Sequence, residues 1–89
     1  MNNQRRKEVK KLSKRVDDLL SLAEILRDDI ESVKMDEDEA YDNLPESFKY
    51  GDQGEEMEQN VEHLDDAFSS LDDVCYSLNE AVEYFIMIS

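Results

Sequence analysis

The sequence predicts an all-α protein: a long antiparallel helical hairpin, coiled-coil-like, that we expect to dimerise into a four-helix bundle. Three observations predict this fold class. Apolar residues recur every three or four positions in both halves of the chain, which is the spacing of a coiled-coil seam. Helix breakers are few, with two Gly and one Pro in 89 residues, and they lie between the halves. A chain of this length makes at most one domain, so residues 1–89 are interpreted as one.

The first helix is expected at about residues 3–42. Its apolar positions alternate in steps of three and four, which places them on one stripe of an α-helix. Asn43, Leu44 and Pro45 should end this helix, because proline disfavours helical geometry in the residue before it. The stripe comprises Val9, Leu12, Val16, Leu19, Ala23, Leu26, Ile30 and Val33.

A turn is expected at 43–52 and a second helix at about 53–87. Pro45 to Tyr50 has the length of one short helical turn. Asp52 is interpreted as the N-cap of the second helix, with Glu55 as its capping partner. The second apolar stripe comprises Met57, Val61, Leu64, Phe68, Leu71, Cys75, Leu78, Val82 and Phe85.

One antiparallel register aligns the two stripes along their full length. It brings Leu26 opposite Leu71 and the small residues Ala23 and Cys75 opposite each other. Two unrelated heptad patterns need not agree in this way, so the agreement favours a hairpin.

Further apolar residues flank the seam and indicate a second interface. Two packed helices alone make a marginal scaffold, and exposure of so much apolar surface is unusual in a soluble protein. We therefore expect a homodimer, with a hairpin completed by a foreign protein as the alternative. The expected dimer interface comprises Leu20, Leu22, Ile25, Ala67, Val74 and Ala81.

The charge is strongly negative and unevenly distributed. The formal net charge is −14, while seven of the ten basic residues lie between Arg5 and Arg15. An anionic body of this kind repels nucleic acid and anionic membranes and attracts basic protein surfaces. In the hairpin register the basic start of the first helix should form ion pairs with Glu80 and Glu83. The densest acidic cluster, our expected partner-binding surface, comprises Asp36, Glu37, Asp38, Glu39, Asp42, Glu55, Glu56 and Glu58.

No pattern in the sequence indicates a catalytic, cofactor or metal site, so we expect a protein that is not an enzyme. His63 is the only histidine and is interpreted as a surface residue. Cys75 is the only cysteine, which excludes an internal disulfide, and is interpreted as a small seam residue. Asp36 and Asp38 resemble the opening of a calcium loop, but Tyr41 stands where that loop needs glycine.

The expected location is the cytoplasm. The basic N-terminus is not followed by the apolar segment of a signal peptide. No apolar run approaches the roughly 20 residues of a membrane span.

Four short segments of the chain are similar to segments of known proteins: residues 39–47, 54–58, 64–67 and 71–73. Together they resemble a group of small acidic helical proteins of unassigned function, encoded by phages and prophages of Gram-positive bacteria. The likeness covers residues 1 to about 84, and the turn Asn43-Leu44-Pro45-Glu46 is its most specific part. The resemblance implies a mobile-element accessory protein that acts in a bacterial host; no residue role follows from it.

Two functions remain open from the sequence. The first is a non-enzymatic protein-binding module that modulates or inhibits a host protein through its acidic surface. In its sharpest form the carboxylates mimic the phosphates of a nucleic acid and inhibit a defence or nucleic-acid-binding protein. The alternative is a structural or oligomerisation protein whose acidic surface only provides solubility.

Overall fold

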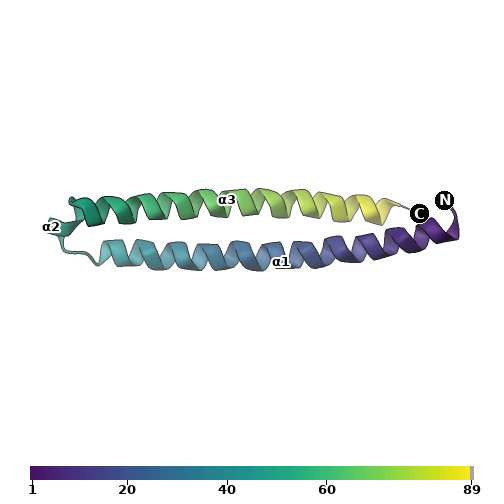
Figure 1. Ribbon diagram of the computed structural model, residues 1–89, viewed down its shortest axis with the longest axis horizontal. Helices are drawn as coiled ribbons and strands as arrows, with labels where there is room; N and C mark the ends of the chain where they lie inside the picture. Colours follow the sequence, from purple (N-terminus) through teal and green to yellow (C-terminus); the bar gives the residue numbers. More distant parts are fainter. Residues whose placement is uncertain (89) are drawn as a thin grey trace.

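The computed structural model describes residues 1–88 and confirms the all-α antiparallel hairpin (Figure 1). Helix α1 spans Asn3–Asp42, α2 spans Glu46–Lys49 and α3 spans Asp52–Met87. The molecule is a rod of 69 × 14 × 14 Å. Both ends of the chain lie at the end of the rod opposite α2 (Figure 1).

Polar groups define the two ends of α1. At its start, Asn2 Oδ1 accepts a hydrogen bond from the backbone N–H of Arg5 at 2.8 Å, which satisfies one of the unpaired donors of the first turn. At its end, the backbone N–H of Asn43 donates to Glu39 O at 3.0 Å, and the chain turns away before Pro45. Both bounds of α1 are those expected from the sequence.

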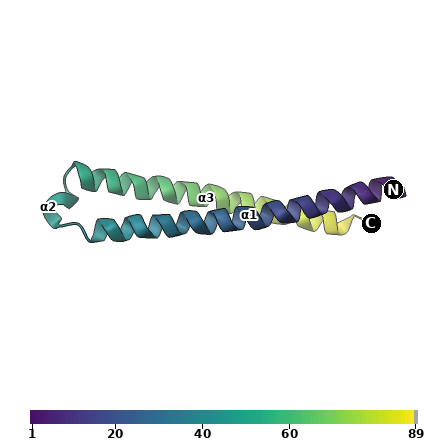
Figure 2. The same ribbon diagram turned by 60° about the horizontal axis from the view of Figure 1, so that its bottom comes forward.

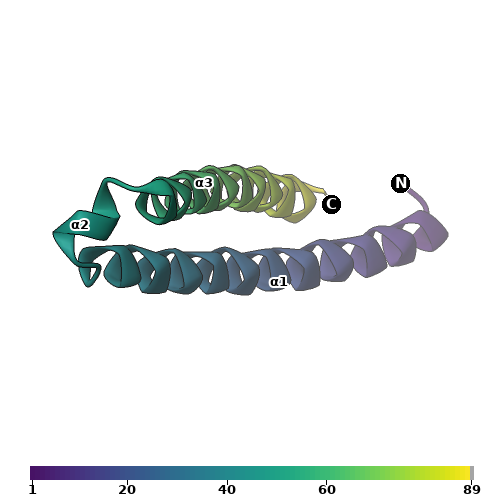
Figure 3. The same cartoon turned by 60° about the vertical axis from the view of Figure 1, so that its left-hand side comes forward.

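The start of α3 differs from the expectation, and the N-cap prediction for Asp52 is wrong. The N-cap is Gly51, no side chain caps it, and Asp52 is the first residue of the helix. The reason is the packing of α2 against this turn (Figure 3). Gly54 is buried, and a Cβ there would lie 2.0 Å from Lys49 O. The backbone of Lys49 is therefore held closely against the first turn of α3 at Gly54.

The seam of α3 is the expected one. All nine residues of its apolar stripe are buried or half-buried, and they are Met57, Val61, Leu64, Phe68, Leu71, Cys75, Leu78, Val82 and Phe85. In the view of Figure 2, α1 and α3 cross over each other along the rod. Such winding is expected for two helices whose heptad seams stay in contact.

The seam of α1 is rotated relative to the expectation. Half of the predicted stripe is buried or half-buried, and the rest is exposed: Leu12, Leu19, Leu26 and Val33. In each case the residue that follows is half-buried in the seam instead: Ser13, Leu20, Arg27 and Lys34. The aliphatic stems of Arg27 and Lys34 can cover the seam while their charged ends reach carboxylates on α3.

The resulting core is thin. Ala23 and Cys75, 7% and 6% exposed, are its buried hydrophobic residues, and no large side chain within residues 1–88 is fully buried. The hairpin by itself therefore removes little apolar surface from water.

Candidate functional site

Three polar contacts join α1 to α3 along one side of the seam. Arg27 Nη1 donates to Asp72 Oδ1 at 3.1 Å and Lys34 Nζ donates to Asp65 Oδ1 at 2.8 Å. The Tyr41 hydroxyl donates to Glu58 Oε1 at 2.6 Å. Each successive pair lies one heptad further along α1 and one heptad back along α3, so all three share one register.

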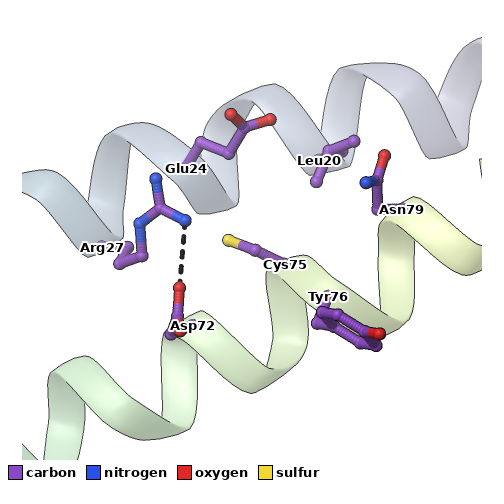
Figure 4. Close-up of a pocket in the computed structure, with 7 residues that line it drawn as sticks. All are labelled: Leu20, Glu24, Arg27, Asp72, Cys75, Tyr76 and Asn79. Carbon is purple, nitrogen blue, oxygen red and sulfur yellow. Dashed lines mark hydrogen bonds and ion pairs between the residues drawn. The ribbon is translucent and has the colours of Figure 1, made fainter.

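We call this side the acidic flank. Carboxylates of both helices line it at heptad intervals of about 10 Å. It comprises Glu24, Glu31 and Asp38 of α1 and Glu58, Glu62, Asp65 and Asp72 of α3. A shallow hollow near its middle is lined by Leu20, Glu24 and Tyr76, among others. Figure 4 shows Arg27 reaching across this hollow to Asp72, with Cys75 Sγ directed toward α1.

Neighbouring carboxylates raise the pKa values of the three donors in these contacts. Hydrogen bonds to Asp28, and then to Asp72, raise the pKa of Arg27. The hydrogen bond to Asp65 raises the pKa of Lys34. The hydrogen bond that Tyr41 donates to Glu58, followed by desolvation, raises the pKa of Tyr41 to about 12.

Each lysine and arginine that follows Arg15 has a contact partner within the hairpin. Arg27 and Lys34 pair with aspartates of α3, and Lys49 Nζ lies 5.6 Å from the ring centre of Tyr41, within the range of a cation–π contact. The acidic flank therefore combines a dense row of carboxylates with cations that are already occupied within the hairpin.

The expected partner-binding cluster does not form one surface. Glu37 is half-buried in the seam, and Glu58 accepts the hydrogen bond of Tyr41. Asp38 and Glu58 line one hollow of the acidic flank. The remaining members are exposed around the turn end of the rod: Asp36, Glu39, Asp42, Glu55 and Glu56.

The local density of acidic residues in the sequence does not reveal the acidic flank as a unit. The signal that identifies the flank is periodicity. Glu58, Asp65 and Asp72 occupy one heptad position of α3, and Glu24, Glu31 and Asp38 occupy one of α1.

The opposite side of the seam, which we call the apolar flank, is open. Its central hollow is lined almost entirely by carbon atoms of Leu19, Leu22, Ala23 and Leu26 from α1 and Leu71, Val74 and Leu78 from α3. Leu22 is 64% exposed and Leu26 is 50% exposed. The apolar surface continues toward the chain ends past Leu12 and Val16, where Arg15 borders it.

The residues expected at a dimer interface fall on three surfaces. Leu22 and Val74 line the apolar flank. Ala67 and Ala81, both half-buried, share the heptad position of Val74. Leu20 lies on the acidic flank. Ile25 is 58% exposed, one helical turn from Leu22 toward the outer face of α1.

The expected ion pairs at the chain ends are absent, so that prediction is wrong. Within residues 1–88, Glu80 and Glu83 pair with no basic side chain; Lys14 pairs with Asp18 of its own helix at 3.9 Å. The cross-helix ion pairs lie in the other half of the rod, because only Arg27 and Lys34 occupy the inward-facing positions. The basic start of α1 is consequently exposed.

Across residues 1–88, no three His, Cys, Asp or Glu side chains are grouped to hold a metal ion. His63 is exposed and Cys75 is buried. None of α1, α2 and α3 contains an apolar stretch that could cross a bilayer.

No protein-family model matches the chain, and neither a curated protein nor a solved structure shows significant similarity to it.

Proposed function

We propose that this chain is a non-enzymatic protein-binding module whose acidic flank binds a basic surface of a protein partner. The observation that supports this proposal is the row of carboxylates along the flank, beside cations already paired within the hairpin. Arg27 and Lys34 neutralise Asp72 and Asp65, whereas the other five carboxylates of the flank form no ion pair within residues 1–88. An incoming protein therefore meets net negative charge on a rigid rod, which favours arginine- and lysine-rich surfaces.

The charge density indicates how strongly such a rod could compete with nucleic acid. A net charge of −14 along 69 Å is about one charge per 5 Å, whereas duplex DNA carries one per about 1.7 Å. A single hairpin is thus a weak imitation of a duplex. The partner we propose is a host protein that normally binds nucleic acid. In this proposal the chain is a phage or prophage accessory protein that inhibits this partner in the bacterial cytoplasm.

The test compares two variants with the same loss of charge. The first neutralises the acidic flank outside the cross-helix pairs, with Glu24→Gln, Asp38→Asn and Glu62→Gln. The matched control neutralises outer-face residues, with Asp18→Asn, Glu39→Gln and Glu56→Gln. Each variant and the wild-type chain are immobilised, and proteins retained from a Gram-positive bacterial lysate are identified by mass spectrometry.

We expect the wild-type chain and the control to retain the same basic protein and the flank variant to lose it. Retention should fall steeply between about 50 and 500 mM salt because exposed charges are screened, and duplex DNA should displace the retained protein. Equal retention by all three chains, or retention indifferent to salt, would contradict the proposal.

The exposed apolar flank favours a second function, that of an oligomerisation protein whose carboxylates only keep it soluble. Leu19, Leu22 and Leu26 border one open hollow, which is unusual for an isolated domain. A chain that self-associates and retains no basic protein at low salt would support this alternative.

A further inference from the structure

We infer that a second copy of this chain covers the apolar flank, docked antiparallel about a two-fold axis beside Leu22. This inference concerns the side of the seam opposite the acidic flank, and it holds whether or not a basic partner exists.

The first observation is that the core of a single hairpin is incomplete. No large side chain within residues 1–88 is fully buried, while seven apolar residues from both helices surround the central hollow of the apolar flank. A second hairpin laid over this hollow would turn a two-helix seam into the interior of a four-helix bundle.

The second observation is the charge pattern along the border of the apolar flank. Arg15, Leu22 and Asp29 occupy the same heptad position of α1, and Arg15 and Leu22 both line hollows of this flank. A two-fold axis beside Leu22 places Arg15 of each copy opposite Asp29 of the other. Parallel docking would instead place Arg15 against Arg15 and Asp29 against Asp29.

The third observation is the polarity of the whole rod. Its open end carries the basic residues between Arg5 and Arg15, which form no ion pair with α3 within residues 1–88. The turn end carries the acidic run from Asp36 to Glu39. Antiparallel docking brings opposite ends together, whereas parallel docking stacks like charges, which is unfavourable. One like-charged approach, Glu8 to Asp36, remains and is outnumbered by the neighbouring cations.

A second copy therefore fits this flank by apolar character and by charge. The acidic flanks of both copies would face outward in the dimer. Two hairpins side by side would also carry twice the net charge of one hairpin over nearly the same length.

The first experiment compares Leu22→Glu with Ile25→Glu in sedimentation equilibrium. Both side chains are exposed in the hairpin, but only Leu22 lines the apolar flank. We expect the wild-type chain and Ile25→Glu to have twice the mass of 10.4 kDa at about 100 µM. Leu22→Glu should weaken the dimer at least about tenfold, because it buries a charge. A monomeric wild-type chain, or equal behaviour of the two variants, would overturn the inference.

The second experiment tests the direction of docking without depending on the apolar residues. Arg15→Glu should weaken the dimer about threefold to tenfold, because two ion pairs become repulsive. The double variant Arg15→Glu with Asp29→Arg should restore the wild-type dissociation constant, because it exchanges the partners. Failure of the exchange to restore dimerisation would rule out the antiparallel arrangement.

The third experiment measures distance. Tyr50 is highly exposed at the turn end, so Tyr50→Cys in a Cys75→Ala background accepts one spin label per copy, and circular dichroism confirms that helix content is kept. Antiparallel docking of rods 69 Å long places the labels about 60 Å apart. A separation below about 30 Å, the width expected for parallel rods of this diameter, would overturn the inference.

Discussion

Neighbouring residues of α1 have opposite surroundings on the two flanks of the seam. Arg27 and Lys34 are half-buried and bonded to aspartates of α3 on the acidic flank. Leu26 and Val33, the residues immediately before them, are 50% and 55% exposed on the apolar flank. At these two sites the charged side chain is thus closer to the seam than its apolar neighbour.

The difference shows which side chains are buried when two helices cannot cover all of their apolar surface. A hairpin offers α1 only one neighbour, so α1 can turn either its leucines or its long cations toward α3. Turning Arg27 and Lys34 inward forms ion pairs and covers the seam with aliphatic stems. It also leaves a continuous apolar surface on the other side of the seam.

The largest expected effect comes from a change that disturbs both flanks at once. Gly54→Ala places a Cβ 2.0 Å from Lys49 O, so α2 must move and the register of α1 against α3 loosens. We expect a loss of about 1–3 kcal/mol in the free energy of unfolding, measured by urea titration. Gly51→Ala is the control, because its Cβ meets Phe48 O at an ordinary 3.7 Å. Equal losses would show that the close approach at Gly54 does not fix the turn.

A smaller effect separates the flanks directly. Leu26→Ala removes a half-exposed side chain from the apolar flank and should lower the free energy of unfolding by about 1–2 kcal/mol, below the range for a fully buried leucine. Arg27→Met keeps the aliphatic stem on the acidic flank and removes the ion pair to Asp72. It should change stability less than Leu26→Ala at low salt and less still at 1 M salt, where exposed charges are screened. A larger loss for Arg27→Met would show that the ion pairs, not the leucines, stabilise the hairpin.

The smallest effect is confined to alkaline pH. The pKa of Tyr41 rises from 10.0 to about 12 in the folded chain, so its contribution is complete below pH 10 and is lost as pH rises toward 12. Thermal unfolding of Tyr41→Phe should therefore depend less steeply on pH between 10 and 12 than that of the wild-type chain. Tyr50→Phe, at a highly exposed tyrosine, is the control. An unchanged slope in Tyr41→Phe would contradict the hydrogen bond to Glu58.

The sequence by itself determined the two long helices, the turn between them and their antiparallel register. Heptad spacing fixes the angle of each side chain around its own helix, and Pro45 with the two glycines confines the break to one place. The spacing also placed Leu22 and Val74 outside the seam and carboxylates on heptad rows of both helices.

Only the tertiary structure decided which side of each stripe closes and how α3 begins. Leu26 and Arg27 lie at similar angles on either side of the line through Ala23 and Ile30, so periodicity cannot say which of them turns inward. That choice depends on the reach of Arg27 and Lys34 to aspartates of another helix. Likewise, Asp52 has the chemistry of an N-cap, but the approach of Lys49 to Gly54 is a contact between separate elements, which local sequence does not encode.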